Sequence, residues 1–141
     1  MKRIVLLTVA ATLVFALGGA MAQANAADPQ APFVGAWWSI DPLDDSMQKL
    51  CIRPGWWAGK YRLYLFDNEA SICQCEHICS AIATGWGSAS NSVLGATMRV
   101  YCLGRSSRYW GSITMIFEVV DGTLVDSDGV VWHPMGTAPP L

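Results

Sequence analysis

The sequence has little charge. Of its 141 residues, 14% are Asp, Glu, Lys or Arg, and eleven acidic residues outnumber nine basic ones. Ordinary soluble domains contain about 25% charged residues. Because a nucleic-acid-binding protein needs a basic surface, this balance excludes nucleic acid as an expected partner. The short chain also excludes an arrangement of several domains.

Sequence motifs for catalysis are missing as well. The chain contains no G-x-S-x-G nucleophile elbow, no H-E-x-x-H zinc motif and no P-loop, and its two histidines are His77 and His133. The D-x-D-G fragment at 126–129 begins like an EF-hand loop but lacks the remaining calcium ligands, so it predicts a turn. We therefore expect a protein without enzymatic activity and without a cofactor.

The longest apolar run lies near the N-terminus. Two basic residues precede it, it extends over 4–17, and small residues then offer A-x-A cleavage sites that end at Ala22 and Ala26. This order is typical of a secretory signal peptide, and the run is too short to cross a hydrocarbon core of ~30 Å comfortably. We expect a signal peptide over 1–26, cleaved after Ala22 or Ala26. The protein is then secreted or periplasmic, with no membrane anchor after processing.

The remaining chain predicts β-structure throughout. Residues 27–32 contain two prolines and predict a flexible lead-in, so that a single domain occupies 33–141. In this domain no window shows sustained helical periodicity, and short runs rich in Val, Ile, Tyr, Trp and Thr alternate with Gly, Asp, Asn and Pro. The predicted strands are 35–40, 47–53, 60–66, 80–88, 93–102, 109–120, 123–126 and 130–133.

The last strands are the most clearly predicted, because turn residues mark their ends and apolar residues alternate along them. Asp121-Gly122 lies between two apolar runs and predicts a type I′ hairpin turn, and 126–129 predicts a second turn. Alternate residues in the preceding strands are apolar, which is typical of an antiparallel sheet with one wet face. The predicted core faces are Leu94, Ala96, Met98, Val100 and Cys102 in one strand, and Ile113, Met115, Phe117 and Val119 in the next.

Eight short strands without crossover helices determine the expected fold. We predict an all-β, antiparallel up-and-down meander. Such a meander is expected to curl and close into a small barrel, because closure removes the exposed strand edges.

Tryptophan is abundant, with seven in the chain. Trp37 and Trp38 are adjacent on a predicted strand, so their side chains must point to opposite faces of the sheet. The stretch 53–60 predicts a hairpin loop that carries Trp56 and Trp57. Two indole rings in a loop are exposed to solvent unless one folds back as a lid over the barrel or both contact a partner.

These aromatic residues predict a binding site. Trp and Tyr are favoured at protein interfaces and on platforms where sugars stack. We expect an exported binding module whose ligand is a small molecule, a glycan or a protein, held by desolvation of aromatic faces. The candidate ligand-binding residues are Trp56, Trp57, Tyr64, Arg108 and Trp110.

The segment Gly35-Ala36-Trp37 has a G-x-W pattern that resembles the N-terminal signature of the calycins, the lipocalin- and avidin-type barrels. The resemblance covers three residues. It implies that the glycine lets the first strand bend and that the tryptophan plugs one end of the barrel. In lipocalins a basic residue covers this tryptophan, and His133 stands about where the last strand should carry it. The lipocalin N-terminal 3₁₀ segment and C-terminal helix have no visible counterpart here.

Segments 41–46, 61–67 and 126–132 also resemble small secreted bacterial domains of unknown function. Bacteria use small calycin-like barrels with one disulfide as inhibitors. The resemblance therefore implies an alternative function, an exported inhibitor of a protease or cell-wall hydrolase whose lead-in, 27–32, enters the target's cleft. A structural component of the envelope is the third interpretation.

All five cysteines follow the predicted signal peptide, and export makes disulfides the default. Cys73 and Cys102 are each placed at the end of a strand, and the resembling domains keep a cysteine at both places, so the resemblance implies a Cys73–Cys102 disulfide. A second bridge would join Cys51 to Cys75 or Cys79, or close the short loop between Cys75 and Cys79. At least one cysteine is left over if all bridges are intramolecular.

The segment 73–79 has a second interpretation as a metal site. Its three thiols and His77 are ligands that zinc or copper(I) prefers. Structural zinc sites usually use two separated pairs of ligands, whereas this segment offers one cluster. An exported chain also meets oxidation before metal, so we expect disulfides here and no metal.

Overall fold

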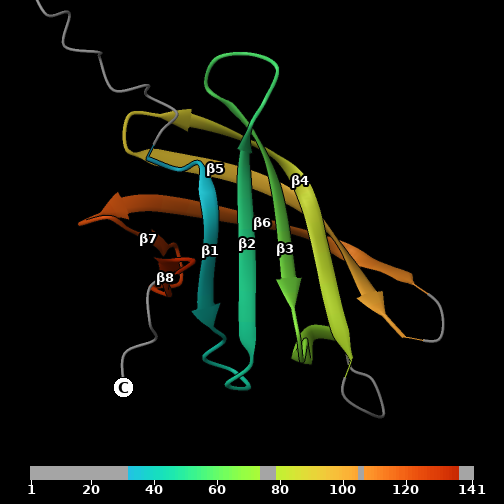
Figure 1. Ribbon diagram of the computed structural model, residues 1–141. Coiled ribbons are helices and arrows are strands. Elements are labelled where there is room, and N and C mark those ends of the chain that lie inside the picture. Colours follow the sequence, from blue (N-terminus) through green and yellow to red (C-terminus); the bar gives the residue numbers. More distant parts are fainter. Residues whose placement is uncertain (1–31, 74–78, 105–106, 137–141) are drawn as a thin grey trace, which may run out of the picture.

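The computed structural model describes residues 32–73, 79–104 and 107–136. The strands are β1 (Gly35–Ile40), β2 (Met47–Pro54), β3 (Lys60–Asp67), β4 (Ser80–Ser90), β5 (Val93–Leu103), β6 (Arg108–Val120), β7 (Thr123–Asp126) and β8 (Val131–Pro134). They follow one another in antiparallel up-and-down order, and β1 pairs with β8 to close the barrel (Figure 1). A short 3₁₀ helix, η1 (Ser71–Cys73), lies between β3 and β4.

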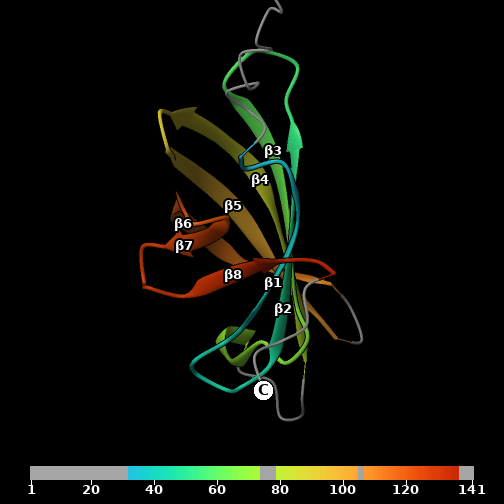
Figure 2. The same ribbon diagram turned by 60° about the vertical axis from the view of Figure 1, so that its left-hand side comes forward.

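The predicted all-β barrel is confirmed, and each strand lies within two residues of its predicted bounds. The closing contact is short: Trp37 lies opposite Pro134, and Trp38 lies opposite His133. Figure 2 shows β8 crossing in front beside β1, where the sheet meets itself. Closure pairs the first strand with the last, so neither is left as a free edge strand.

The N-terminal 31 residues lie outside the described part of the chain, and with them the predicted signal peptide and all but the last residue of the predicted lead-in, 27–32. No helix within the described residues is long and apolar enough to cross a membrane. The described chain begins just before Phe33, which is fully buried. Phe33 therefore belongs to the packed core.

The core fills the inside of the barrel and comes from alternate residues of the strands. Both predicted core faces are confirmed. On β5 the buried members are Leu94, Ala96, Met98 and Val100. On β6 Phe117 is fully buried, and Ile113, Met115 and Val119 pack partly buried against the core. Residues between them point outward, which leaves the outer face of the sheet free to carry a site.

Both predicted turns near the C-terminus are present. Asp121 and Gly122 have positive φ angles of 48° and 81°, as a type I′ turn requires. In the second turn, Gly129 has a φ of 82° and its N–H donates to the carbonyl oxygen of Asp126 at 3.0 Å. The glycines are needed here because larger residues rarely adopt positive φ.

Asp126 ties the second turn to the core. Its Oδ1 accepts hydrogen bonds from the N–H groups of Asp128 and Val130, at 3.0 and 2.9 Å. Its Oδ2 accepts a third from the indole Nε1 of Trp132 at 3.0 Å, and Trp132 is fully buried. A buried carboxylate is costly unless such donors surround it, and here three donors do so.

The two ends of the barrel have different interiors. We call the end with the β2–β3 loop the loop end and the end with η1 the disulfide end. Phe33 and Tyr61 close the loop end with ring centroids 5.7 Å apart. The indole Nε1 of Trp37 donates to the carbonyl oxygen of Phe33 at 3.1 Å, and both residues belong to the hydrophobic core.

Trp37 and Trp38 point to opposite faces, as predicted. Trp37 belongs to the core, whereas Trp38 lies on the outside of the barrel and is buried there by its neighbours. The imidazole of His133 stacks on Trp38, with ring centroids 4.9 Å apart. The expectation that His133 covers the tryptophan of the G-x-W pattern is therefore wrong, because β8 pairs with β1 in a register that places His133 opposite Trp38.

Candidate functional site

A groove of about 560 Å³ lies on the outer face of the sheet near the loop end. We call it the tryptophan groove. Ligand pockets usually have volumes of about 300 to 1,000 Å³, so this groove is large enough for a small molecule or a short oligomer. Its outward-facing residues are Trp57, Lys60, Trp86, Ser88, Gly95, Thr97, Thr114 and Ile116.

The strand register builds this groove from segments that are far apart in the sequence. One row of cross-strand neighbours on β3, β4, β5 and β6 consists of Lys60, Ser88, Gly95 and Ile116. The adjacent row consists of Trp86, Thr97 and Thr114. Residues two apart on a strand share a face, so both rows point outward.

Two indole rings line the groove. Trp57, from the β2–β3 loop, is 73% exposed, and Trp86, on β4, is 50% exposed. Gly95, on β5, also lines the groove and has no side chain, and a Cβ added there would meet nothing within 4 Å. The missing side chain leaves space in the groove for a ligand.

Three hydroxyl groups, from Ser88, Thr97 and Thr114, lie in a lining that is mostly apolar. Lys60 Nζ donates to Ser88 Oγ at 2.6 Å. The hydroxyl oxygens of Thr97 and Thr114 lie 3.4 Å apart, and both side chains are exposed. Each hydroxyl both donates and accepts hydrogen bonds. The lining therefore offers several exposed donors and acceptors among apolar atoms.

Arg62 lies beside the groove and fixes the position of one wall. Its Cζ atom is 5.7 Å from the ring centroid of Trp86 and 5.1 Å from that of Tyr64. Both distances fall within the roughly 6 Å range of cation–π attraction. The predicted site residue Tyr64 therefore contacts Arg62 on the outer face and does not line the groove.

The five predicted site residues do not form one site. Trp57 lines the groove, whereas Trp56, which is 86% exposed, does not. Arg108 and Trp110 line a polar hollow beside the disulfide. The register places Arg108 opposite Cys102, at the far end of the strands from the tryptophan groove, roughly 20 Å away at 3.3 Å per residue.

Trp86 is the site residue that the sequence analysis did not select. It lies in the predicted strand 80–88, where alternation gives it the same face as Ile82 and Thr84. That alternation was the available signal, because Ala81 and Ala83 are the apolar residues of the inward face. A bulky ring on the outward face of a strand is a marker for an exposed aromatic site.

The interior of the disulfide end contains a cavity of about 150 Å³ whose lining includes Asp41 and Asp67. Gln48 Nε2 donates to one carboxylate oxygen of each, at 2.8 and 3.4 Å. Ser46 Oγ donates to Asp67 at 3.0 Å. Both aspartates are buried, and their neighbours satisfy them with hydrogen bonds.

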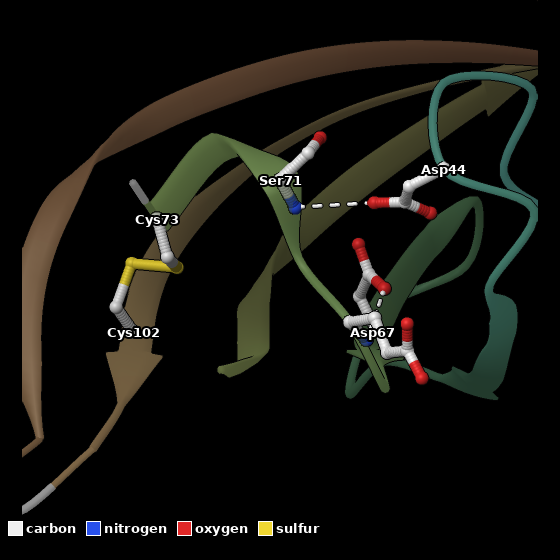
Figure 3. The surroundings of a disulfide bond; sticks show 6 residues. Asp44, Asp67, Ser71, Cys73 and Cys102 are labelled. Atoms are coloured by element: carbon white, nitrogen blue, oxygen red, sulfur yellow. Dashed lines mark hydrogen bonds between the residues drawn. A yellow bond between two sulfur atoms is a disulfide. The ribbon is translucent and has the colours of Figure 1, made fainter. Parts of the chain in front are cut away.

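Two carboxyl groups at this end have displaced pKa values of opposite sign. Burial raises the pKa of Asp41, and the charges of Asp44 and Asp67 act in the same direction against hydrogen bonds from Leu43 and Gln48. Burial also acts to raise the pKa of Asp44, but hydrogen bonds from two serines outweigh it and lower the pKa. Figure 3 shows one of these bonds, from the Ser71 N–H to Asp44 at 3.2 Å.

The Cys73–Cys102 disulfide is present, with its Cα atoms 5.6 Å apart (Figure 3). Cys79 is also disulfide-bonded, whereas Cys51 is a free, partly buried thiol on β2. A bridge from Cys51, which the sequence left open, is therefore wrong. Cys51 lies opposite Tyr64 on the outer face, away from the cysteines of the disulfide end.

The alternative metal site cannot be placed in full. Cys75 and His77 fall within 74–78, which lies outside the described residues. In the described ranges, no group of three or more His, Cys, Asp or Glu side chains could hold a metal ion.

Comparison with known proteins finds no matching family model, no matching curated protein and no matching solved structure.

Proposed function

We propose that this protein is an exported, non-enzymatic binding module and that its ligand is a saccharide held in the tryptophan groove. The observation that carries the proposal is that two exposed indoles, Trp57 and Trp86, line one groove together with three hydroxyl groups. Aromatic faces pack against the C–H faces of sugar rings, and hydroxyl and ammonium groups bind sugar hydroxyls.

The shape of the groove favours a saccharide over a protein partner. A stable protein interface covers about 800 Å² on each partner and depends on well-packed apolar anchors. The tryptophan groove has a volume of about 560 Å³, and its lining combines the hydroxyl groups of Ser88, Thr97 and Thr114 with a larger apolar surface. This mixture suits a ligand that is polar at its edges and apolar on its faces.

The test is binding of the mature protein to an array of neutral and acidic oligosaccharides and peptidoglycan fragments. Trp57→Ala and Trp86→Ala should each weaken binding about tenfold or more, since burial of a large apolar side chain contributes roughly 1.5 to 3 kcal/mol. Trp56→Ala is the matched control, because Trp56 is in the same loop and more exposed but does not line the groove.

The outcomes separate clearly. Loss of binding with Trp57→Ala and Trp86→Ala, but not with Trp56→Ala, supports the proposal. If no saccharide on the array is retained by the wild-type protein, or if all three substitutions weaken binding equally, the tryptophan groove is not a saccharide site. Thermal unfolding of each variant shows whether a loss reflects misfolding, and these exposed positions should change stability by less than about 1 kcal/mol.

A further inference from the structure

Five of the six lysines and arginines in the described strands lie on β2, β3 and β5, and the sixth, Arg108, lies on β6 beside the disulfide. The first five are all exposed on the outer face: Lys49, Arg53, Lys60, Arg62 and Arg99. On the strands from β2 to β6 the acidic residues are Asp67 and Glu118. Asp67 points into the barrel, and Glu118 is exposed on β6 opposite Val93, two residues after Ile116 and on the same face, but does not line the groove.

Two of these cations face each other directly. Arg53 on β2 lies opposite Arg62 on β3 in the strand register. Like charges that are directly opposite on one face of a sheet destabilise it. No carboxylate in the described part of the chain forms an ion pair with Arg53, Arg62 or Lys60. Arg62 is held by the rings of Tyr64 and Trp86, and no described carboxylate offsets the repulsion, although the protein as a whole carries net negative charge.

These cations border the tryptophan groove on one side. Lys60 lines the groove, and Arg62 lies against the ring of Trp86. The opposite border, on β6, consists of the uncharged residues Thr114 and Ile116. A ligand whose ring packs against Trp86 would therefore place one edge beside an ammonium and a guanidinium group. Guanidinium is the group that best matches the planar geometry of a carboxylate or sulfate.

We propose that the tryptophan groove selects an anionic saccharide, whose sugar ring packs on the indoles while its carboxylate or sulfate faces Lys60 and Arg62. This inference rests on the proposed function and adds the charge of the ligand to it. An anion at this position relieves the repulsion between Arg53 and Arg62, which a neutral sugar cannot do. Lys60 and Arg62 on β3 then provide the selectivity for a charged ligand, and the two indoles provide the affinity for its sugar ring.

The test compares matched pairs of ligands by tryptophan fluorescence titration at low ionic strength. The first pair is oligogalacturonate and the same oligomer with its carboxyl groups methyl-esterified. The second pair is sulfated and unsulfated cello-oligosaccharide, which distinguishes sulfate from carboxylate as the recognised group. At least one charged ligand should bind more tightly than its neutral partner, and this difference should shrink as salt is added, because salt screens exposed charges.

Substitution of the cations identifies the residues responsible. Lys60→Gln and Arg62→Gln should each reduce affinity for the charged ligand roughly two- to fivefold, the range of exposed ion pairs, and should reduce affinity for the neutral partner less. Lys49→Gln removes the same charge from the same face but lies further along β2, opposite Phe66, so it should leave both affinities unchanged.

The results separate this inference from the proposed function. Equal binding of both members of each pair, lost on Trp86→Ala, overturns selectivity for an anion and leaves saccharide binding in place. An equal effect of Lys49→Gln and Arg62→Gln also overturns it, because net charge alone would then explain the preference. If neither the charged nor the neutral oligomers bind, and the array is also empty, both proposals fail.

Discussion

The loop end and the disulfide end of the barrel differ in the residues that fill the interior and in those that are exposed outside. At the loop end the apolar rings of Phe33 and Tyr61 close the interior, and on the outer face near that end Trp57 and Trp86 remain exposed. At the disulfide end polar groups occupy the interior, where Gln48 bridges two buried aspartates. The interior is thus apolar at the loop end and contains two carboxylates at the disulfide end.

The two ends also differ in whether these groups have interaction partners within the chain. Around the disulfide end the buried carboxylates accept several hydrogen bonds each, so their role is explained by the stability of the fold. In the tryptophan groove the exposed indoles and the cations beside them have few partners in the chain. Features that the fold does not need are the better candidates for function.

Removal of the Cys73–Cys102 disulfide should have the largest effect, because it should lower stability without changing binding at the other end. Cys73 and Cys102 are 29 residues apart, so in the chain-entropy model their bond stabilises the fold by roughly 3 to 4 kcal/mol. The double Cys→Ser variant should melt at least about ten degrees lower. Below its melting temperature, ligand binding in the tryptophan groove should be unchanged. A variant with an unaltered melting temperature, or with impaired binding while folded, would show that this separation does not hold.

Substitution of Asp126 should reduce the free energy of unfolding less than removal of the disulfide does. Asp126→Ala leaves the buried Trp132 indole N–H and two backbone N–H groups without their acceptor, so urea unfolding should show a loss of roughly 2 to 3 kcal/mol. Asp126→Asn keeps one acceptor oxygen and should cost less. Equal stability of the Asn and Ala variants would mean that the hydrogen bonds to Asp126 are not what holds the turn.

Gly95→Val should move stability and binding in opposite directions. Gly95 is in a strand, and a Cβ at this position meets nothing, so valine should stabilise the fold by about 0.5 to 1 kcal/mol. The same side chain fills the tryptophan groove and should weaken saccharide binding, with Gly95→Ala giving a smaller effect. Thermal unfolding and fluorescence titration on the same samples test both parts. Undiminished binding by the valine variant would place the ligand elsewhere.

Asp41→Asn should have the smallest effect, and the effect should depend on pH. Because the pKa of Asp41 is raised in the folded protein, the charged form costs stability above that pKa. As the pH falls through the raised pKa towards the usual Asp value of about 3.9, the cost disappears. The variant should therefore melt slightly higher at pH 7, and the gain should vanish in acid. A gain that persists at low pH would assign the effect to packing.

The fold was predictable because its signals are local. The alternation in β5 and β6 and the Asp121-Gly122 turn are each visible within a short window of sequence, and all were confirmed. The placement of His133 failed for a different reason. It depends on the closing register between β1 and β8, which no short window determines.

The candidate site was only partly predictable. Trp57 could be selected because a bulky ring in a loop has little to pack against. Trp86 could not be grouped with Trp57 from the sequence, because that grouping depends on the pairing of Lys60 with Ser88, which brings β4 beside the β2–β3 loop. Arg108 and Trp110 were grouped with the loop tryptophans by residue type, and the register places them at the other end of the strands.

The most direct measurement is an oxidation footprint of the exposed tryptophans. N-bromosuccinimide would be applied to the protein with and without saturating oligogalacturonate, or with the tightest array ligand, and each indole would be followed by mass spectrometry. We predict protection of Trp57 and Trp86, with Trp56 and Trp110 oxidised equally in both samples. Protection of Trp110, or equal oxidation of all four indoles while the saccharide is bound, would contradict the assignment of the tryptophan groove as the binding site.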